Sequence, residues 1–318
     1  MKTNKIYLGD CLELMKQIPD GSIDMILCDL PYGTTQCKWD TIIPLDKLWK
    51  EYNRVCKKNA AIVLTSAQPF TSALIMSNPK YFKYNWIWEK SKATGYLNAK
   101  KMPMRAHEDV CIFYRKPPTY NPQMVQGQPY NKGTAHRPTS VYGAQGLKEK
   151  TKKRKQIAKM IKDKDRLDAL KLVRLEMDKM NLSWSIIDKT TSMIERIIEA
   201  VKPLKTTVKN TTGLRYPRTV QYFKTAESEG KKSVIHPTQK PIALFEYLIK
   251  TYTNEGDVVL DNCVGSGTTA VACINTKRKY IGMELDEEYY NKCIARINKL
   301  TNNEKKEEKC KKDSQKVK

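Results

Sequence analysis

The segment at residues 257–276, "DVVLDNCVGSGTTAVACINT", decides the fold because it predicts three kinds of local structure in succession. An apolar strand ends at Asp261, a turn follows with Gly265 and Gly267, and helical spacing begins at Thr268. Glycine adopts positive φ angles and lets other groups approach the backbone closely. The first turn of a helix has free N–H groups that suit a polar or anionic ligand. We therefore predict a strand, a turn and a helix, with a ligand site at the turn.

An acid follows these glycines at the distance that is typical of a nucleotide site. The next apolar run, "YIGMEL" at 280–285, places Glu284 at its end. Acids at this place bind ribose hydroxyls in nucleotide-binding α/β folds. The turn is not a complete G-x-G-x-x-G, and it lacks the G-K-[ST] of a triphosphate-binding loop. A dinucleotide and a nucleoside triphosphate are therefore weak interpretations, and a purely structural turn remains open.

Other short apolar runs, rich in β-branched and aromatic residues, predict further strands. They are "IDMILCD" (23–29), "AAIVLTSAQPF" (60–70), "YNWIWEK" (84–90) and "DVCIFYRK" (109–116). Segments with helical spacing occur at residues 45–56, 241–253 and 286–300. Strands that alternate with helices indicate an α/β protein, with a mostly parallel sheet that is covered on both faces.

The middle of the chain differs from both ends in composition. Residues 117–146 and 213–235 are rich in turn-forming residues and predict irregular loop. Residues 147–202 predict a basic helical hairpin, which is either a solvated insert or an element that lies along phosphates. The predicted division is a first part of the main domain at 1–116, an inserted region at 117–235, a second part at 236–300 and a disordered charged tail at 301–318.

The 318-residue chain carries a formal net charge of +24. Such a charge makes a polyanion the first partner to consider, although a lysine-rich genome would also raise the count. No apolar run reaches the roughly 18–20 residues of a membrane helix, and the start of the chain lacks an apolar signal core. The nine cysteines form no C-x-x-C pair. We therefore expect no metal, no membrane and a reducing cytoplasm.

A second motif, "ILCDLPYG" at 26–33, places a carboxylate, a rigid proline and an aromatic ring at the end of a predicted strand. Its "DLPY", together with the glycine turn, resembles the motifs of the amino-group DNA methyltransferases that use S-adenosylmethionine. Further segments that resemble this family are "YLGDCLELM" (7–15), "TSAQPF" (65–70) and "HPTQKP" (236–241).

The order of the motifs resembles the β class of that family, because "DLPY" precedes the glycine turn. The resemblance covers about residues 4–120 and 210–298. It implies a permuted Rossmann-like methyltransferase sheet, in which the strand that begins at Lys5 lies beside the strand that ends at Glu284. It also implies that the inserted region at 117–235 recognises the target sequence.

The resemblance implies a catalytic role for each residue of "DLPY". Asp29 would accept a hydrogen bond from the N6 amine of an extruded adenine, and the carbonyl of Leu30 would accept the second. Pro31 would fix the loop backbone, and Tyr32 would stack on the flipped base. Leu30 stands where the commonest family form has proline, but only its carbonyl is needed. Aspartate as the first residue is the usual form in adenine-N6 enzymes, and serine in cytosine-N4 enzymes.

S-adenosylmethionine is the cofactor that the resemblance implies. Asp10 would meet its adenine, Glu284 its ribose hydroxyls and Thr238 its methionine end. The predicted cofactor contacts are Asp10, Thr238, Asp261, Gly265, Gly267, Thr268 and Glu284. Because the sulfonium is already an activated donor, catalysis is mainly a matter of positioning, and no histidine or cysteine is assigned a catalytic role.

Double-stranded DNA is the implied partner, with predicted contacts at Lys92, Arg105, Arg215 and Arg218. Lys90, Lys92 and Arg105 are expected on a loop after "WIWEK". Arginines read guanine edges, whereas lysines bind phosphates. The family also implies a homodimer and a bacterial or phage enzyme that works at the nucleoid.

Other functions remain open. They are a cytosine-N4 methyltransferase and a catalytically silent DNA-binding relative. The intact "DLPY" and glycine turn disfavour the silent protein. A glutamine or RNA methyltransferase is a poorer interpretation, because those relatives usually place the glycine turn first.

Overall fold

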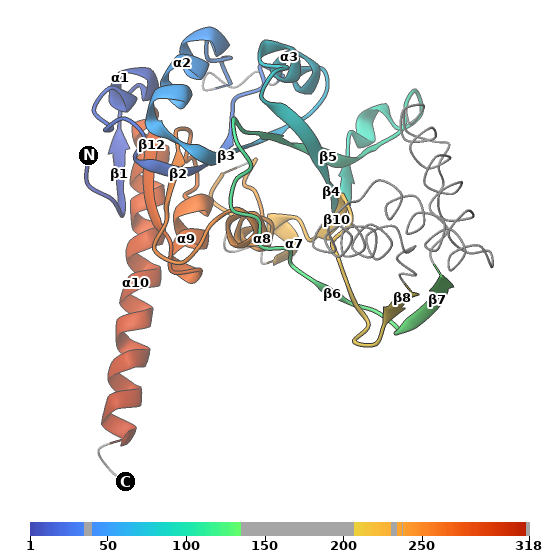
Figure 1. Ribbon diagram of the computed structural model, residues 1–318. Coiled ribbons are helices and arrows are strands. Elements are labelled where there is room, and N and C mark those ends of the chain that lie inside the picture. Colours follow the sequence, from blue (N-terminus) through green and yellow to red (C-terminus); the bar gives the residue numbers. More distant parts are fainter. Residues whose placement is uncertain (35–39, 135–206, 230–233, 237, 316–318) are drawn as a thin grey trace, which may run out of the picture. The chain divides into compact units, whose positions relative to one another are not determined.

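The computed structural model describes residues 1–34, 40–134, 207–229, 234–236 and 238–315. Eight strands form one sheet in the order β1-β12-β11-β2-β3-β5-β4-β10 (Figure 1). In chain order they are β1 (Lys5–Leu8), β2 (Ile23–Asp29), β3 (Cys56–Ser66), β4 (Phe82–Thr94), β5 (Arg105–Phe113), β10 (Val220–Phe223), β11 (Val258–Asp261) and β12 (Lys279–Glu284). Among these strands only β5 runs antiparallel to its neighbours. The predicted mostly parallel sheet is therefore confirmed.

The first strand in chain order, β1, pairs with the last strand in chain order, β12. Lys5 lies opposite Ile281, and Leu8 lies opposite Glu284 in the parallel ladder of β1 and β12. The backbone N–H of Gly9 continues the pairing with a 2.8 Å hydrogen bond to the carbonyl of Glu284. This is the permuted arrangement that the order of the motifs implies.

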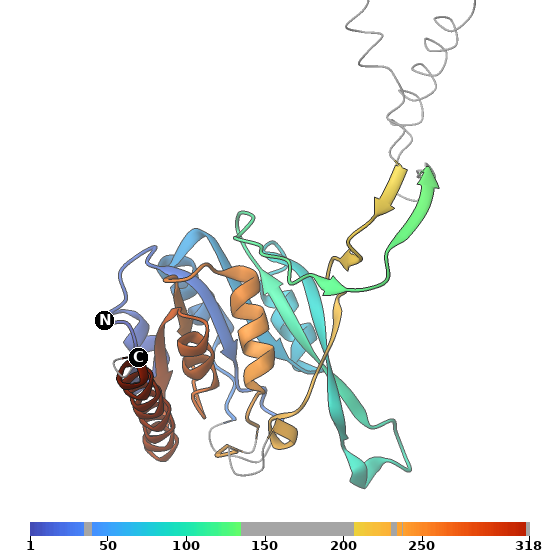
Figure 2. The same cartoon turned by 90° about the horizontal axis from the view of Figure 1, so that it is seen from below.

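Helices cover both faces of the sheet because its strands are apolar on both faces. In β2, Met25 and Leu27 belong to one apolar core, whereas Ile26 and Cys28 belong to the other. The first core contains α8, α9 and the start of α10, and the second contains α1, α2 and α3 (Figures 1 and 2). The helices are α1 (Cys11–Met15), α2 (Leu45–Val55), α3 (Phe70–Ser77), α7 (Ala226–Glu229), α8 (Ile242–Tyr252), α9 (Thr268–Asn275) and α10 (Glu287–Gln315), with a 3₁₀ turn η1 (Tyr96–Asn98).

Helix α2 illustrates how the sequence specifies these faces. Its buried residues are Leu48, Trp49, Tyr52 and Val55, which recur at the three- and four-residue spacing of one helical stripe. The stripe packs on the same core as Leu64 of β3. The predicted helix at 45–56 is therefore confirmed, and it ends one residue earlier than predicted because Cys56 begins β3.

The chain divides into two compact units. One consists of Met1–Val125 and Tyr216–Lys318, and the other of Gln126–Arg215. The described part of the second unit contains β7 (Tyr130–Thr134) paired antiparallel with β8 (Thr207–Asn210). A second short ladder joins β6 (Val125–Gln126) and β9 (Leu214–Arg215). The predicted helical hairpin at 147–202 lies outside the described residues, and the predicted domain bounds stay a prediction.

Three segments differ from the sequence expectation. The loop expected at 117–146 contains β6 and β7, and the loop expected at 213–235 contains β9, β10 and α7. Strand β10 pairs with β4 from Val220 opposite Ile87 onward, so the main sheet supplies the pairing that its short sequence does not predict. Helix α10 continues to Gln315 through residues expected to be a disordered tail. The lysines and glutamates of that stretch are good helix formers even without an apolar stripe.

Among the described residues, no helix is both long enough and apolar enough to span a bilayer.

Candidate active site

Four acids follow four neighbouring parallel strands and meet at one edge of the sheet. Asp10 follows β1, Glu284 ends β12, Asp261 ends β11 and Asp29 ends β2. All four line one cavity of about 830 Å³. Ligands of open α/β sheets bind outside the carboxyl ends of the strands. The cavity is therefore the candidate active site, and two distant motifs of the sequence contribute to it.

Backbone N–H groups hold Glu284. The N–H of Gly265 donates to Oε2 at 2.7 Å, and the N–H of Asp286 donates to Oε1 at 3.0 Å. Burial disfavours the charged form and raises the pKa of this carboxyl, although these two hydrogen bonds counteract the rise. Each oxygen still has a lone pair for a further donor. Glu284 can therefore accept hydrogen bonds from a ligand without losing its support.

Asp261 supports the glycine turn through two hydrogen bonds. Its Oδ1 accepts the N–H of Cys263 at 3.0 Å, and its Oδ2 accepts the hydroxyl of Thr269. Burial raises the pKa of Asp261 to about 6, because the charged form is poorly solvated there. The side chain ties the end of β11 to the first turn of α9.

Asp10 caps helix α1. Its Oδ1 accepts the N–H of Leu12 at 2.7 Å and the N–H of Glu13 at 3.3 Å. An aspartate at this position satisfies N–H groups that the helix leaves unpaired. The cap fixes the carboxylate at the rim of the cavity.

The two glycines of the turn have different surroundings. Gly265 lines the cavity at a φ of +49°, and a Cβ there would have only an ordinary 3.9 Å contact with His236. Gly267 has a φ of +80°, and a Cβ there would lie 2.6 Å from the sulfur of Cys293 on α10. Gly267 is not among the residues that line the cavity. The first glycine thus lies at the ligand face, and the second is needed for the approach of α10.

Helix α10 also holds the turn through Arg296. Its Nη1 donates to the carbonyl of Ser266 at 2.8 Å and to the hydroxyl of Thr268 at 3.3 Å. The Thr268 hydroxyl in turn donates to the carbonyl of Lys240 at 3.2 Å. The predicted contact Thr268 therefore joins the glycine turn to the "HPTQKP" segment.

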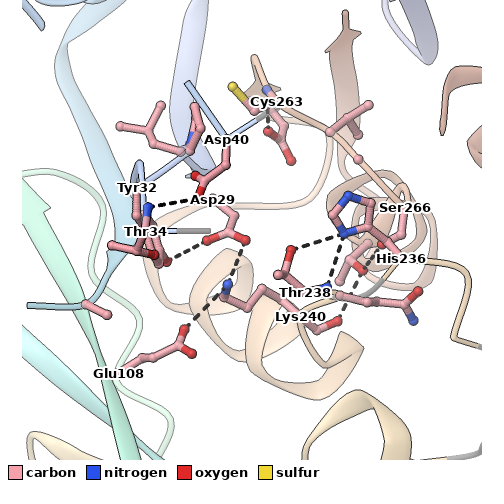
Figure 3. Close-up of a pocket in the computed structure, with 18 of the residues that line it drawn as sticks. Asp29, Tyr32, Thr34, Asp40, Glu108, His236, Thr238, Lys240, Cys263 and Ser266 are labelled. Carbon is pink, nitrogen blue, oxygen red and sulfur yellow. Dashed lines mark hydrogen bonds and ion pairs between the residues drawn. The ribbon is translucent and has the colours of Figure 1, made fainter. Parts of the chain in front are cut away.

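Side chains hold Asp29 at the other wall of the cavity. The hydroxyl of Tyr32 donates to Oδ1 at 2.7 Å, and the hydroxyl of Thr65 donates to the same oxygen. The ammonium of Lys240 lies 2.6 Å from Oδ2. Figure 3 shows Tyr32 and Lys240 beside the carboxylate. Asp29 is thus presented by three side chains from three segments.

The "TSAQPF" segment supports the "DLPY" loop. Thr65 lies at the end of β3, and Phe70 begins α3, where its ring stacks on Tyr32 with centroids 5.3 Å apart. Leu30 is buried, and Leu30 and Pro31 both line the cavity. The motif at 65–70 therefore positions the loop at 29–32.

A second aspartate, Asp40, closes the loop after Tyr32. Its two oxygens accept the N–H groups of Gly33 at 2.8 Å and Thr34 at 2.9 Å (Figure 3). Gly33 has a φ of +67°, and a Cβ there would lie 2.9 Å from Ile42. Glycine is therefore required at this position after the "DLPY" loop.

The "HPTQKP" segment places Thr238 and His236 at the cavity. The Thr238 hydroxyl lies 3.1 Å from Nδ1 of His236, whose ring packs on Tyr289 with centroids 4.2 Å apart. Burial lowers the pKa of His236. Both residues line the cavity.

Sequence reasoning missed a buried chain of charges beside Asp29. Lys240 lies between Asp29 and Glu108, and Lys90 lies 2.5 Å from Oε1 of Glu108. Lys90 was expected on a loop, but it lies inside β4 with 8% of its side chain exposed. That expectation was wrong because β4 continues to Thr94. The "K" of "HPTQKP" was visible in the sequence, but its partners were not.

The predicted DNA contacts lie on different elements. Lys92 on β4 and Arg105 at the start of β5 line the rim of the cavity, and both are exposed. These strands continue into a hairpin that extends beyond their neighbours (Figure 2). Arg218 precedes β10 in the first unit, and Arg215 belongs to the second unit, where it donates to the carbonyl of Gln128 at 3.2 Å.

The fold and the cavity define an α/β enzyme of the methyltransferase type, with a glycine turn and a "DLPY" loop at one edge of the sheet. The family profile described as DNA methylase, which covers N6 and N4 enzymes, matches residues 23–296. The chain therefore belongs to the N6/N4 DNA methylase family.

Two curated relatives differ in how much of their length the chain matches. The type II methyltransferase M1.MboII of Moraxella bovis is 23% identical over 319 residues, which span 94% of this chain and 98% of that enzyme. The type II methyltransferase M.HpaI of Haemophilus parainfluenzae is 41% identical over 81 residues, which span 26% of each chain. The chain thus matches about a quarter of the HpaI enzyme and nearly all of the MboII enzyme.

Two solved structures share the fold. The M1.HpyAVI–SAM complex has a TM-score of 0.51 and 19% identity, over 92% of this chain and 98% of that one. The cytosine-N4-specific PvuII DNA methyltransferase has a TM-score of 0.55 and 15% identity, over 93% and 86%. The methyltransferase fold predicted from the sequence is confirmed.

Proposed function

We propose that the protein transfers a methyl group from S-adenosylmethionine to the N6 amine of an adenine that is turned out of double-stranded DNA. One observation carries this proposal. Asp29 of the "DLPY" loop lines the same cavity as the glycine turn and Glu284. A base amine on Asp29 and a cofactor on Glu284 would therefore share one cavity.

The cofactor half of the cavity fits a nucleoside joined to an amino acid. Glu284 keeps free lone pairs for a ribose diol, and Gly265 leaves the turn open for close approach. Asp10 is fixed at the rim, where it can accept a hydrogen bond from the adenine amine. Thr238 and Thr268 supply hydroxyls for the polar amino-acid end. When bound, S-adenosylmethionine supplies an activated methyl group on a positively charged sulfur.

The base half of the cavity fits an amine donor. Asp29 accepts hydrogen bonds and, with the Leu30 carbonyl, can orient an amino group. This orientation aims the nitrogen lone pair along one direction, and such positioning supplies most of the catalysis in a transfer from an activated donor. Stacking of a base on Tyr32 is worth about 1–3 kcal/mol, which offsets much of the few kcal/mol that base flipping costs.

Adenine is favoured over cytosine by the first residue of the loop. Asp29 resembles the usual form of the adenine-N6 enzymes, and the resemblance of the fold to a cytosine-N4 enzyme at 15% identity concerns the fold alone. The strongly basic composition supports a nucleic-acid substrate. The expected homodimer and the expected absence of a metal stay predictions.

The test is single-molecule sequencing of DNA from a host that lacks its own DNA methylation and expresses this chain. We expect N6-methyladenine at one sequence motif, and none in cells that express Asp29→Ala. N4-methylcytosine in its place would overturn the choice of base but keep the reaction. Unmodified DNA, from soluble protein that still binds DNA, would favour a silent DNA-binding relative.

A further inference from the structure

Lys240 places an ammonium on the proposed acceptor of the target amine. Its Nζ lies 2.6 Å from Oδ2 of Asp29, and only 7% of its side chain is exposed. It also lies over the ring of Tyr32, 5.5 Å from the centroid. A buried lysine requires an anionic partner. Lys240 therefore contacts both groups that are proposed to receive the base.

Asp29 has little capacity for a further donor while Lys240 is in place. Its Oδ1 already accepts the hydroxyls of Tyr32 and Thr65, which use both lone pairs of that oxygen. Its Oδ2 accepts the ammonium of Lys240. An incoming amine must therefore approach Oδ2, where Lys240 already uses one of the two lone pairs and its positive charge disfavours a second donor beside it.

Glu108 offers Lys240 a second position. Its Oε1 is paired with Lys90 at 2.5 Å, whereas its Oε2 is buried and has no hydrogen-bond donor among the described residues. This oxygen lies 3.4 Å from Nζ of Lys240 (Figure 3). A normal N–H···O distance is about 2.9 Å. A short movement of the ammonium would therefore satisfy Glu108 and release Oδ2 of Asp29.

The backbone of Lys240 is held, whereas its side chain has the rotatable bonds that such a movement needs. Its carbonyl accepts a 3.2 Å hydrogen bond from the Thr268 hydroxyl, and the next residue, Pro241, is the N-cap of α8. The four-carbon stem of lysine has several rotatable bonds and carries a compact charge. One residue thus joins the glycine turn to Asp29.

Lys240 stays charged at neutral pH. Burial alone would lower the pKa of its ammonium, but Asp29 and Glu108 together outweigh burial and raise that pKa. A protonated lysine cannot accept the proton that the methylated amine releases. The role that remains is to position Asp29 and to balance its charge.

We infer that the ammonium of Lys240 occupies the position of the target amine on Asp29. When the base enters, this ammonium moves to Glu108. This inference rests on the proposed function. Lys240 is then a positioning residue, and Glu108 is the group that receives its ammonium. The ion pair with Lys240 keeps Asp29 ordered before the base arrives.

The decisive test compares Glu108→Gln with Lys240→Met. The target adenine is replaced by 2-aminopurine, whose fluorescence reports extrusion, and kcat, KM for DNA and cofactor affinity are measured alongside. In Glu108→Gln the ammonium loses its receiving charge and stays on Asp29. We expect about a tenfold rise in KM and a weaker fluorescence signal, with unchanged cofactor affinity.

Lys240→Met should act in the opposite direction on base capture. The base meets no competitor, so the fluorescence signal is kept or increased. Asp29 then loses its paired cation, whereas Glu108 keeps Lys90, so the acid limb of the pH–kcat profile moves to higher pH. Besides Lys240, the titratable groups that interact with Asp29 or Glu108 are Cys28, Tyr32, Lys90, His236 and Asp261.

Lys240→Arg provides a second variant in case Lys240→Met does not fold. Its guanidinium keeps the charge but bridges two carboxylates firmly. The acid limb should therefore stay in place while base capture falls. Lys250→Met is the matched control, since Lys250 on α8 pairs with Glu246 at the same 3.4 Å but lies outside the cavity.

Each outcome has a distinct meaning. Opposite effects of Glu108→Gln and Lys240→Met on base capture support the exchange. Parallel losses in both variants, or wild-type behaviour of Glu108→Gln, overturn it. Absence of methyl transfer by the wild-type protein overturns the proposed function, and this inference with it.

Discussion

The acids at the glycine turn and Asp29 of the "DLPY" loop are held by different kinds of donor. On the wall of the glycine turn, Glu284, Asp261 and Asp10 each accept backbone N–H groups. On the opposite wall, the described donors to Asp29 are the side chains of Tyr32, Thr65 and Lys240. Backbone donors are fixed by the strand ends and helix caps, whereas side chains can change rotamer.

This difference suits the two ligands, the cofactor and the DNA base. A diffusible cofactor can bind to a wall that is already formed, and preorganisation lowers the cost of binding. A base from a duplex arrives after a large movement of the DNA, and it must find an acceptor that is kept in order until then. If the two walls differ in this way, substitutions on them should affect cofactor binding and base capture separately.

The largest effect is expected from Asp29→Asn. The amide keeps the shape of the side chain but loses the charge and the ion pair with Lys240. We expect kcat to fall by about 10²–10³-fold, the size typical of removing one electrostatic group from an active site. Isothermal titration should give unchanged cofactor affinity. Asp24→Asn, at the start of the same strand, is the control, and a loss of cofactor binding in Asp29→Asn would refute the separation of the walls.

A pH-dependent loss of stability is expected from Asp261. Its pKa is raised from 3.8 to about 6, so the native state holds this proton more tightly than the unfolded chain. The stability that this group contributes is complete below about pH 3.8 and is lost as the pH rises through about 6. At 1.36 kcal/mol per pKa unit, the loss is about 3 kcal/mol.

Urea unfolding across this pH range measures the effect. Asp261→Asn should decline less steeply with pH than the wild type. Glu284 also has a raised pKa, but its contribution is common to both proteins. Equal slopes would mean that Asp261 is not buried as the structure has it.

Gly267→Ala should destabilise the glycine turn by about 2–3 kcal/mol, because it adds a contact with Cys293 to the cost of a positive φ. Gly256→Ala is the matched control. Its φ is +86°, and a Cβ there has no neighbour within 4 Å. We expect about 1 kcal/mol for that variant. Equal losses in urea unfolding would show that the packing of α10 does not constrain the turn.

Glu284→Gln should weaken cofactor binding about tenfold, or about 1.4 kcal/mol, while kcat at saturation changes little. The amide has one acceptor oxygen in place of two, so one of the N–H groups of Gly265 and Asp286 loses its partner. Glu287→Gln, on the exposed start of α10, is the control. A fall in kcat without a change in cofactor affinity would show that Glu284 does not act in cofactor binding.

The smallest effect is expected from Lys92→Gln at the rim. Lys92 is 74% exposed and lies 3.7 Å from Glu227, so its ion pair adds little stability. Loss of one phosphate contact should lower the salt slope of DNA affinity by about one. Lys277→Gln is a close control, at 76% exposure and 3.7 Å from Glu255. Equal slopes in the two variants would remove Lys92 from the DNA-binding surface.

The sequence by itself determined the architecture. Apolar runs such as 258–261 and 279–284, each of which ends in an acid, specified parallel strands whose ends carry the site. The order of "DLPY" and the glycine turn implied the permutation, because that order requires β1 to lie beside β12. These features are local in sequence, so they can be recognised without knowledge of distant contacts.

Only the tertiary structure decided how the site is held. Lys240 meets Asp29 across 211 residues, and the partner of Lys90 is Glu108 on the adjacent strand. Gly267 faces Cys293 of α10 and not the cavity. Nothing in the local pattern distinguishes a buried lysine from one that binds phosphate. Its environment is set by side chains that the fold brings together from distant segments, and that environment fixes its charge, its partner and its freedom to move.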